Sequence, residues 1–214
     1  MATADQHEYR TYIDRGFISK KQLDKIIKLT QEVYIETGTD MGAGVKWATG
    51  IPTSNMNIPG VQNFNEVHSI EILENIYNDR KEDFKNDSRV KLHLGDSRIK
   101  FPEILNATTK QCFIFLDAHG EIKETGPIPL YDELNTLKNH NIKNHVIVID
   151  DLRRIGDKKD EGWKKISVND LINSLWEINT NYIIFKYNDS LIAAESNDLI
   201  GPPNNIQIPS KNFK

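Results

Sequence analysis

VYIETGTDMGAG, the sequence of Val33–Gly44, decides the fold of this chain. Its first residues, Val33–Ile35, are β-branched or aromatic and predict a buried strand. An acid, Glu36, stands at the carboxyl end of that strand. Three glycines follow it, at Gly38, Gly42 and Gly44. Glycines at this spacing permit a tight turn in which the backbone approaches a ligand closely, although a glycine-rich turn without a ligand has the same pattern.

The composition indicates a single soluble α/β domain over residues 1–214, with 27% charged and 38% hydrophobic residues. A net charge of −4 argues against a nucleic-acid partner that needs a basic face. Cys112 is the only cysteine, so an intrachain disulfide is excluded and a reducing compartment is favoured. No apolar run approaches about 18 residues, and Met1–Arg10 has no apolar signal core. We therefore expect a cytoplasmic protein without a membrane span.

Alternating strand and helix patterns continue after the glycine turn. Further strands are predicted at Val67–Ile72, Val90–Leu94, Cys112–Leu116 and Val146–Ile149, and amphipathic helices lie between them. A terminal hairpin is predicted from Tyr182–Tyr187 and Ser190–Glu195, joined at Asn188–Asp189. The expected fold is α/β and Rossmann-like, with a seven-stranded, mostly parallel sheet, helices on both faces and a C-terminal antiparallel hairpin.

Other segments are less regular. We expect residues 1–18 to form a loose N-terminal arm, a helix over Lys20–Thr30 to cover the first strand, and residues 202–214 to form a polar tail. A helix is expected to begin at Pro102, a residue that the first turn of a helix permits. The long loop Gly50–Asn65 is interpreted either as a lid or substrate wall, or as an ordered surface excursion.

Acids recur where the predicted strands end. They are Glu36, Glu71, Asp96, Asp117 and the pair Asp150–Asp151. Ligands of open α/β sheets bind beyond the carboxyl ends of the strands, so these acids should share one edge. The first three suit a ligand with a ribose and an adenine, because an acid that ends the second strand can accept hydrogen bonds from ribose hydroxyls.

The last three acids suggest a metal site. Asp117, Asp150 and Asp151 are expected on neighbouring strand ends, where like charges repel one another and raise their pKa values. A hard divalent cation such as Mg²⁺ or Ca²⁺ would remove that conflict. In the alternative interpretation Asp151 caps a helix or pairs with Arg153 or Arg154.

The pattern E-x-G-x-x-x-G-x-G over residues 36–44 resembles the motif of class I S-adenosylmethionine (SAM) methyltransferases. Three further motifs are L-D-A-H at 116–119, P-L-x-x-E-L at 129–134 and I-D-D at 149–151. In this order and spacing they resemble the metal-dependent sugar O-methyltransferases, the macrocin O-methyltransferase-like group, over about Tyr34–Arg153.

That resemblance implies roles for individual residues. The implied cofactor-binding residues are Glu36, Thr37, Gly38, Thr39, Gly42, Glu71, Asp96, Ser97 and Asp117. The implied ligands of Mg²⁺ are Asp117, Asp150 and Asp151, and the metal would bind two adjacent sugar hydroxyls. The implied catalytic residues are Asp117 and His119, with His119 as the base where the family often has an aspartate. Two other roles for His119 stay open, as a metal ligand or as a residue that shapes the turn before Gly120.

The chain is therefore interpreted as a SAM-dependent, Mg²⁺-dependent O-methyltransferase that acts on a hydroxyl of a sugar or glycan. A hydroxyl is a poor nucleophile near neutral pH, so both a metal and a base serve this reaction. A phenolic or other small-metabolite acceptor and a non-catalytic SAM-binding module are the alternatives. An NAD-dependent oxidoreductase is disfavoured because the dinucleotide fingerprint G-x-G-x-x-G has a different spacing. The acceptor hydroxyl and the oligomeric state, a homodimer included, are left open.

Overall fold

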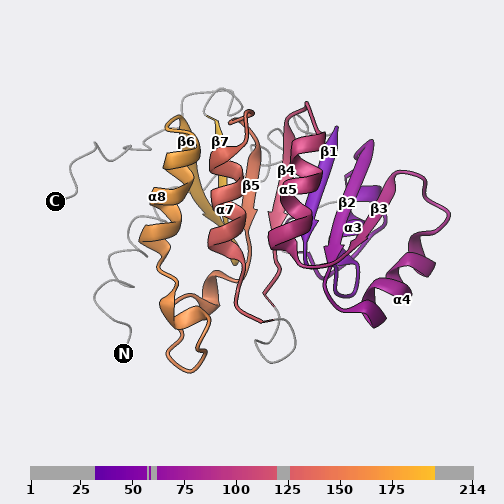
Figure 1. The fold of residues 1–214 in the computed structure, drawn as a ribbon, viewed down its shortest axis with the longest axis horizontal. Coiled ribbons are helices and arrows are strands. Elements are labelled where there is room, and N and C mark those ends of the chain that lie inside the picture. The colour runs from indigo at the N-terminus through magenta and orange to yellow at the C-terminus, as the bar shows by residue number, and fades with distance from the viewer. Residues whose placement is uncertain (1–31, 57, 59–61, 120–125, 196–214) are drawn as a thin grey trace.

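One seven-stranded sheet runs through the molecule in the order β3-β2-β1-β4-β5-β7-β6 (Figure 1). The computed structural model describes residues 32–56, 58, 62–119 and 126–195. The parallel strands are β1 (Val33–Thr37), β2 (Glu66–Glu71), β3 (Val90–Leu94), β4 (Cys112–Leu116) and β5 (Val146–Ile149). The antiparallel strands are β6 (Tyr182–Tyr187) and β7 (Ser190–Glu195). The expected sheet and its C-terminal hairpin are confirmed.

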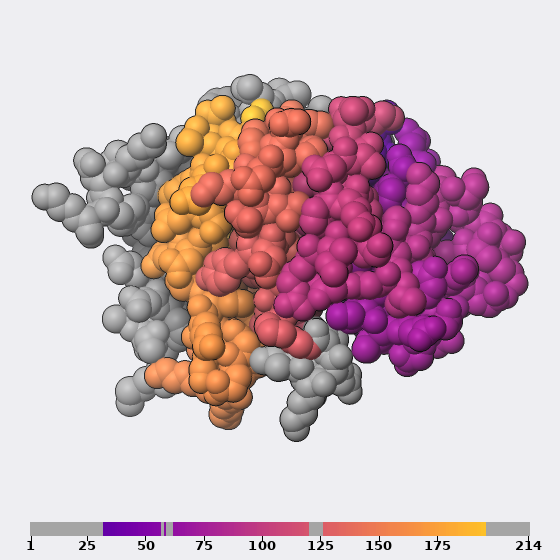
Figure 2. All heavy atoms as spheres, viewed as in Figure 1, coloured from indigo at the N-terminus to yellow at the C-terminus, as the bar shows by residue number. Residues whose placement is uncertain are grey.

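Helices cover the sheet in two layers. One layer consists of α5 (Ser97–Ala107), α7 (Leu130–Asn139) and α8 (Val168–Ile178), which pack side by side (Figure 2). The elements α3 (Ala43–Thr49) and α4 (Glu74–Phe84) contribute to the core on the opposite face. Short 3₁₀ helices, η1 (Leu152–Arg154) and η2 (Trp163–Lys165), follow β5. Across the described ranges, no helix is long and apolar enough to span a membrane.

The sheet separates the core into two hydrophobic clusters, one on each face, because successive strand residues point to opposite faces. In β1, Val33 and Ile35 pack toward α5, α7 and α8, whereas Tyr34 packs on the other face. An aromatic cluster fills that other face, with ring centroids 5.4–6.0 Å apart. Its members are Tyr34, Trp47, Phe64 and Phe113, all fully buried.

The segment between α3 and β2 belongs to this aromatic face. The N–H groups of Gln62 and Phe64 donate to the carbonyls of Trp47 and Ala48, at 2.8 and 2.9 Å. Ile58 is buried together with Phe64. The described part of the loop Gly50–Asn65 is therefore an ordered excursion that completes the core.

The prediction that a helix begins at Pro102 was wrong. Helix α5 begins at Ser97, and Pro102 lies inside it. The side chain of Asp96 caps the helix by accepting a hydrogen bond from the N–H of Arg98, at 2.9 Å. This cap fixes the start of the helix a turn earlier than the proline suggested. The predicted arm 1–18, the helix Lys20–Thr30 and the tail 202–214 lie outside the described residues.

Candidate active site

A cavity of about 330 Å³ opens at the carboxyl ends of β1, β2, β3 and β4. Strand order reverses between β1 and β4, because β2 and β3 lie on one side of β1 while β4 and β5 lie on the other. This switch point is where open α/β sheets bind ligands. The predicted site residues that line the cavity are Gly38, Glu71, Asp96, Ser97, Asp117 and His119.

The turns after β1 and β4 touch each other at the centre of this edge. Gly38 has a φ of 85°, and a Cβ there would lie 2.5 Å from the carbonyl oxygen of Asp117. Only glycine fits, because both the conformation and the space exclude a side chain. The N–H of Asp117 donates to the carbonyl of Thr37 at 3.0 Å, and the N–H of Gly38 donates to the carbonyl of Ile70 at 2.9 Å.

Glu36 lies behind this turn and supports it. Its carboxylate is 2% exposed and accepts hydrogen bonds from Tyr34 Oη at 2.7 Å and Ser69 Oγ at 2.6 Å. A Cβ at Gly44 would lie 1.7 Å from Glu36 Oε2, so the third glycine makes room for the acid. Burial raises the pKa of Glu36 to about 8. The acid of the glycine motif is thus buried behind the turn, and its role in cofactor binding stays a prediction.

Two other acids stand at the wall of the cavity. Glu71 accepts hydrogen bonds from the N–H groups of Asp40 and Leu73, at 3.1 and 2.9 Å. Asp96 accepts two hydrogen bonds from Arg98 Nε, both 3.0 Å long, and one from Nη2. Arg98 holds the pKa of Asp96 below its usual range. Both carboxylates are therefore fixed in place, and each faces the cavity.

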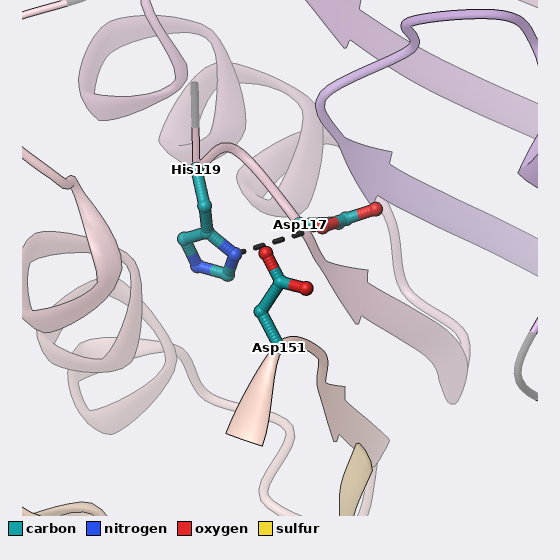
Figure 3. A group of neighbouring side chains, drawn as sticks. All are labelled: Asp117, His119 and Asp151. Carbon is teal, nitrogen blue, oxygen red and sulfur yellow. Dashed lines mark ion pairs between the residues drawn. The ribbon is translucent and has the colours of Figure 1, made fainter. Parts of the chain in front are cut away.

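Asp117, His119 and Asp151 form a group at the other end of the cavity edge (Figure 3). Each offers a ligand atom, and these atoms all lie within 4.8 Å of one another. His119 Nδ1 is 3.6 Å from Asp117 Oδ1. Burial raises the pKa of Asp117. The negative charges of Asp150 and Asp151 raise the pKa of Asp117 further, and His119 opposes this shift. Asp151 has a φ of 63°, an uncommon conformation that functional sites often hold.

The paired acids after β5 have different neighbours. Asp150 is buried and accepts a hydrogen bond from Ser190 Oγ on β7 at 2.7 Å. Asp151 lies 2.7 Å from Arg153 Nη2 and 3.6 Å from Arg154 Nη1. The ion pair considered as an alternative for Asp151 is therefore present. The role of Asp150 as a metal ligand stays a prediction.

The segment after β5 holds His119 from one side. The imidazole ring of His119 packs edge-on against Trp163, with ring centroids 4.7 Å apart. Arg154 Cζ lies over the same tryptophan ring, 5.4 Å from its centroid. Arg154 also donates to the carbonyl of His119 at 3.3 Å. Neither imidazole nitrogen has a hydrogen-bond partner among the residues that the structure describes. His119 is thus fixed in position, with Nδ1 facing Asp117 and neither nitrogen engaged in a hydrogen bond of normal geometry.

The remaining predicted cofactor residues support the turn from behind. Thr37 Oγ1 accepts from the N–H of Asp117 at 3.2 Å, and Thr39 Oγ1 lies 2.6 Å from Ser69 Oγ. A Cβ at Gly42 would meet the ring of Phe84 at 2.9 Å. Sequence reasoning missed other lining residues, among them Asp40, Ile72, Arg98, Pro127 and Pro129. Of these lining residues, only Ile72 carried a signal in the sequence, because it is an apolar residue next to a strand-end acid.

The solved structures that resemble this chain include methyltransferases. MycE methyltransferase of the mycinamycin biosynthetic pathway, bound to Mg and S-adenosylhomocysteine (SAH), matches with a TM-score of 0.55 and 13% identity. The match covers 98% of this chain and 58% of MycE. The O-methyltransferase from Bacillus cereus, bound to SAH, matches with a TM-score of 0.52, 16% identity and coverage of 89% and 87%. The chain has the methyltransferase fold.

A third structure with this methyltransferase fold is fibrillarin from Aeropyrum pernix, bound to SAM. It matches with a TM-score of 0.50 and 12% identity, over 87% of this chain and 74% of fibrillarin. No protein-family model and no curated protein matches the sequence. At these identities, the likeness establishes the architecture.

The buried Glu36 predicts how stability changes with pH. Its pKa is about 8 in the folded protein and near 4.5 when unfolded, so between these values unfolding releases a proton. The free energy of unfolding should then fall as pH rises from 5 to 8, by up to about 1.4 kcal/mol per pH unit. Glu36→Gln should make this slope shallower by removing the contribution of Glu36, while Glu74→Gln, at an exposed site, should keep it unchanged. Urea unfolding followed by circular dichroism measures the free energy of unfolding at each pH. Parallel plots of that free energy against pH for wild type and Glu36→Gln would contradict the assignment.

Proposed function

We propose that the protein is a SAM-dependent O-methyltransferase that transfers the methyl group to a hydroxyl of a sugar or glycan, with Mg²⁺ or another divalent cation. The observation that carries this proposal is the arrangement of the cavity edge. Fixed acids that suit a nucleoside stand at one end, and the group of Asp117, His119 and Asp151 stands at the other. The SAM- and SAH-bound structures with the same fold support the choice of cofactor.

The donor would lie across the contact between the turns after β1 and β4. Glu71 uses its carboxylate oxygens to hold two backbone N–H groups, and their remaining lone pairs can accept hydrogen bonds from ribose hydroxyls. Ile72 and Ile76 line the same end of the cavity and offer apolar surface to a base. Gly38 leaves room for the methionine part because its backbone carries no side chain at the switch point.

The acceptor would approach at the end marked by Asp117, His119 and Asp151. The residues fit a divalent cation, because burial and the neighbouring carboxylates of Asp150 and Asp151 raise the pKa of Asp117, and a positive charge would relieve that conflict. Asp117 and Asp151 would hold it, with Asp150 or His119 as a further ligand. When bound, it supplies a Lewis acid that lowers the pKa of an acceptor hydroxyl.

His119 is the proposed base. Its Nδ1 faces Asp117, which would stabilise the imidazolium that forms when the ring takes the hydroxyl proton. The stack of Arg154, Trp163 and His119 keeps the ring oriented. Since the sulfonium methyl group is already activated, the main task of the chain is to align donor and acceptor oxygen for in-line transfer.

A first prediction tests the donor end. Glu71→Gln should weaken the binding of SAM and of SAH equally, by about tenfold, because a charge-assisted hydrogen bond contributes about 1.5–3 kcal/mol and both ligands carry the ribose. Glu74→Gln, an exposed change on the next helix, should leave both affinities unaltered. Isothermal titration calorimetry provides the dissociation constants. Equal affinities for wild type and Glu71→Gln would remove Glu71 from the ribose site.

A second prediction tests the acceptor end. Transfer to nucleotide sugars or short oligosaccharides should stop in excess chelator and return with Mg²⁺. Asp151→Asn should then need far more Mg²⁺ while its affinity for SAM stays unchanged, and Asp157→Asn in the same segment should behave as wild type. Full activity in chelator would overturn the metal proposal and would leave the Arg153–Asp151 ion pair as the function of that acid.

The same assay separates the roles of His119. If His119 is the base, His119→Gln should lower kcat by about 10²–10⁴-fold at saturating Mg²⁺ and should retain the wild-type affinity for SAM. If His119 is a ligand, added Mg²⁺ should restore the rate. A fall in kcat of less than about tenfold at saturating metal and acceptor would contradict the base assignment.

A further inference from the structure

A buried acid lies beneath the candidate site and has no role in the chemistry described above. Glu133, in the motif P-L-x-x-E-L, belongs to the first turn of α7 and is 1% exposed. Within the part of the chain that the structure describes, neither of its carboxylate oxygens makes a hydrogen bond of normal geometry, and the hydroxyls of Ser97 and Thr37 interact with it only weakly. Buried carboxylates that lack partners are rare in native proteins, because such a group loses its hydration without compensation.

Glu36 and Glu133 are two buried acids with different surroundings. Both acids are buried, but Glu36 accepts short hydrogen bonds from two hydroxyl groups, which satisfy it within the fold. Glu133 therefore differs from Glu36 in having an unused capacity for a positive partner. That capacity is what a ligand could use.

Glu133 lies next to the cavity. Helix α7 begins at Leu130 after Pro129, and Pro129 lines the cavity. Ser97 and His119 also line it, and both act on Glu133: burial raises the pKa of Glu133, while His119, Ser97 and Thr37 oppose the rise. The hydroxyl of Ser97 and both imidazole nitrogens of His119 are likewise buried without a hydrogen bond of normal geometry among the described residues, although His119 Nδ1 lies 3.6 Å from Asp117 Oδ1. Glu133 therefore lies close behind two side chains of the cavity wall, Ser97 and His119.

We propose that Glu133 makes the site prefer the cationic donor SAM over its neutral product SAH. This inference rests on the proposed function. The sulfonium of SAM carries one positive charge that the thioether of SAH lacks. In the transfer, the bond from sulfur to the methyl carbon breaks, the bond from that carbon to the acceptor oxygen forms, and the hydroxyl proton passes to His119. The attraction between Glu133 and the donor therefore ends with the reaction, which favours release of SAH.

A cation in the cavity also explains how the acid is tolerated. Burial disfavours the charged carboxylate, whereas a nearby positive charge favours it. Shielding from water makes the attraction stronger than it would be at an exposed position. The Glu133 carboxylate would thus attract the sulfonium of bound SAM across the intervening side chains. In the free protein the acid would have no such positive partner.

The test compares two dissociation constants in the full-length chain. SAM and SAH are titrated by calorimetry at pH 8 in chelator, into wild type, Glu133→Gln and Asp132→Asn. Glu133→Gln should weaken SAM by about tenfold, because it removes the negative charge that attracts the sulfonium, and should leave SAH within about twofold. Asp132→Asn removes an exposed charge from the same turn and should keep the wild-type ratio.

Other outcomes are decisive as well. An unchanged ratio in Glu133→Gln, or equal weakening of both ligands, would overturn the inference and leave the proposed function standing. If wild type bound neither ligand, the proposed function would fail first. Should Glu133→Gln not fold, Glu133→Met, a neutral residue of similar volume, must show the same loss of preference. Glu133→Asp, which retains the charge, must recover at least part of it.

Discussion

The contact between Gly38 and the carbonyl of Asp117 is the constraint on which the rest of the site depends. It joins the turns after two adjacent parallel strands at the point where strand order reverses. The hydrogen bond from the N–H of Asp117 to the carbonyl of Thr37 fixes the position of the turn after β4 relative to the turn after β1. Because Asp117 and His119 follow directly, any displacement here would move the proposed metal ligands and the proposed base together.

Around this contact, the fold gathers carboxylates and stabilises each one differently. Hydroxyl groups satisfy Glu36, backbone N–H groups hold Glu71, and a guanidinium fixes Asp96. Asp117 and Asp151 lie near each other and near His119, with Arg153 as a partial counterion. Glu133 has no such partner among the described residues. The acids with complete hydrogen bonding support the turn or its wall, while those without it lie where a cation or a charged ligand would complete them.

The sequence predicted the strands well because each one is a short apolar run bounded by turn residues. The runs Cys112–Leu116 and Val146–Ile149 are fully buried, so hydrophobicity alone marks them. The start of α5 was mispredicted because Pro102 was given more weight than the cap at Asp96. The excursion 50–65 stayed ambiguous, since the burial of Ile58 and Phe64 depends on the distant Phe113 and Tyr34. Likewise, the support of His119 by Trp163 joins segments that no local pattern connects.

We propose above all that this cavity edge holds SAM at one end and a metal-assisted acceptor at the other. The most direct measurement is a crystal structure of the full chain with SAH and Mg²⁺. We expect the ribose at Glu71, the methionine part across Gly38 and Asp117, and the metal at Asp117 and Asp151. A structure with saturating SAH that shows the cavity empty, or the ligand bound elsewhere on the protein, would contradict it.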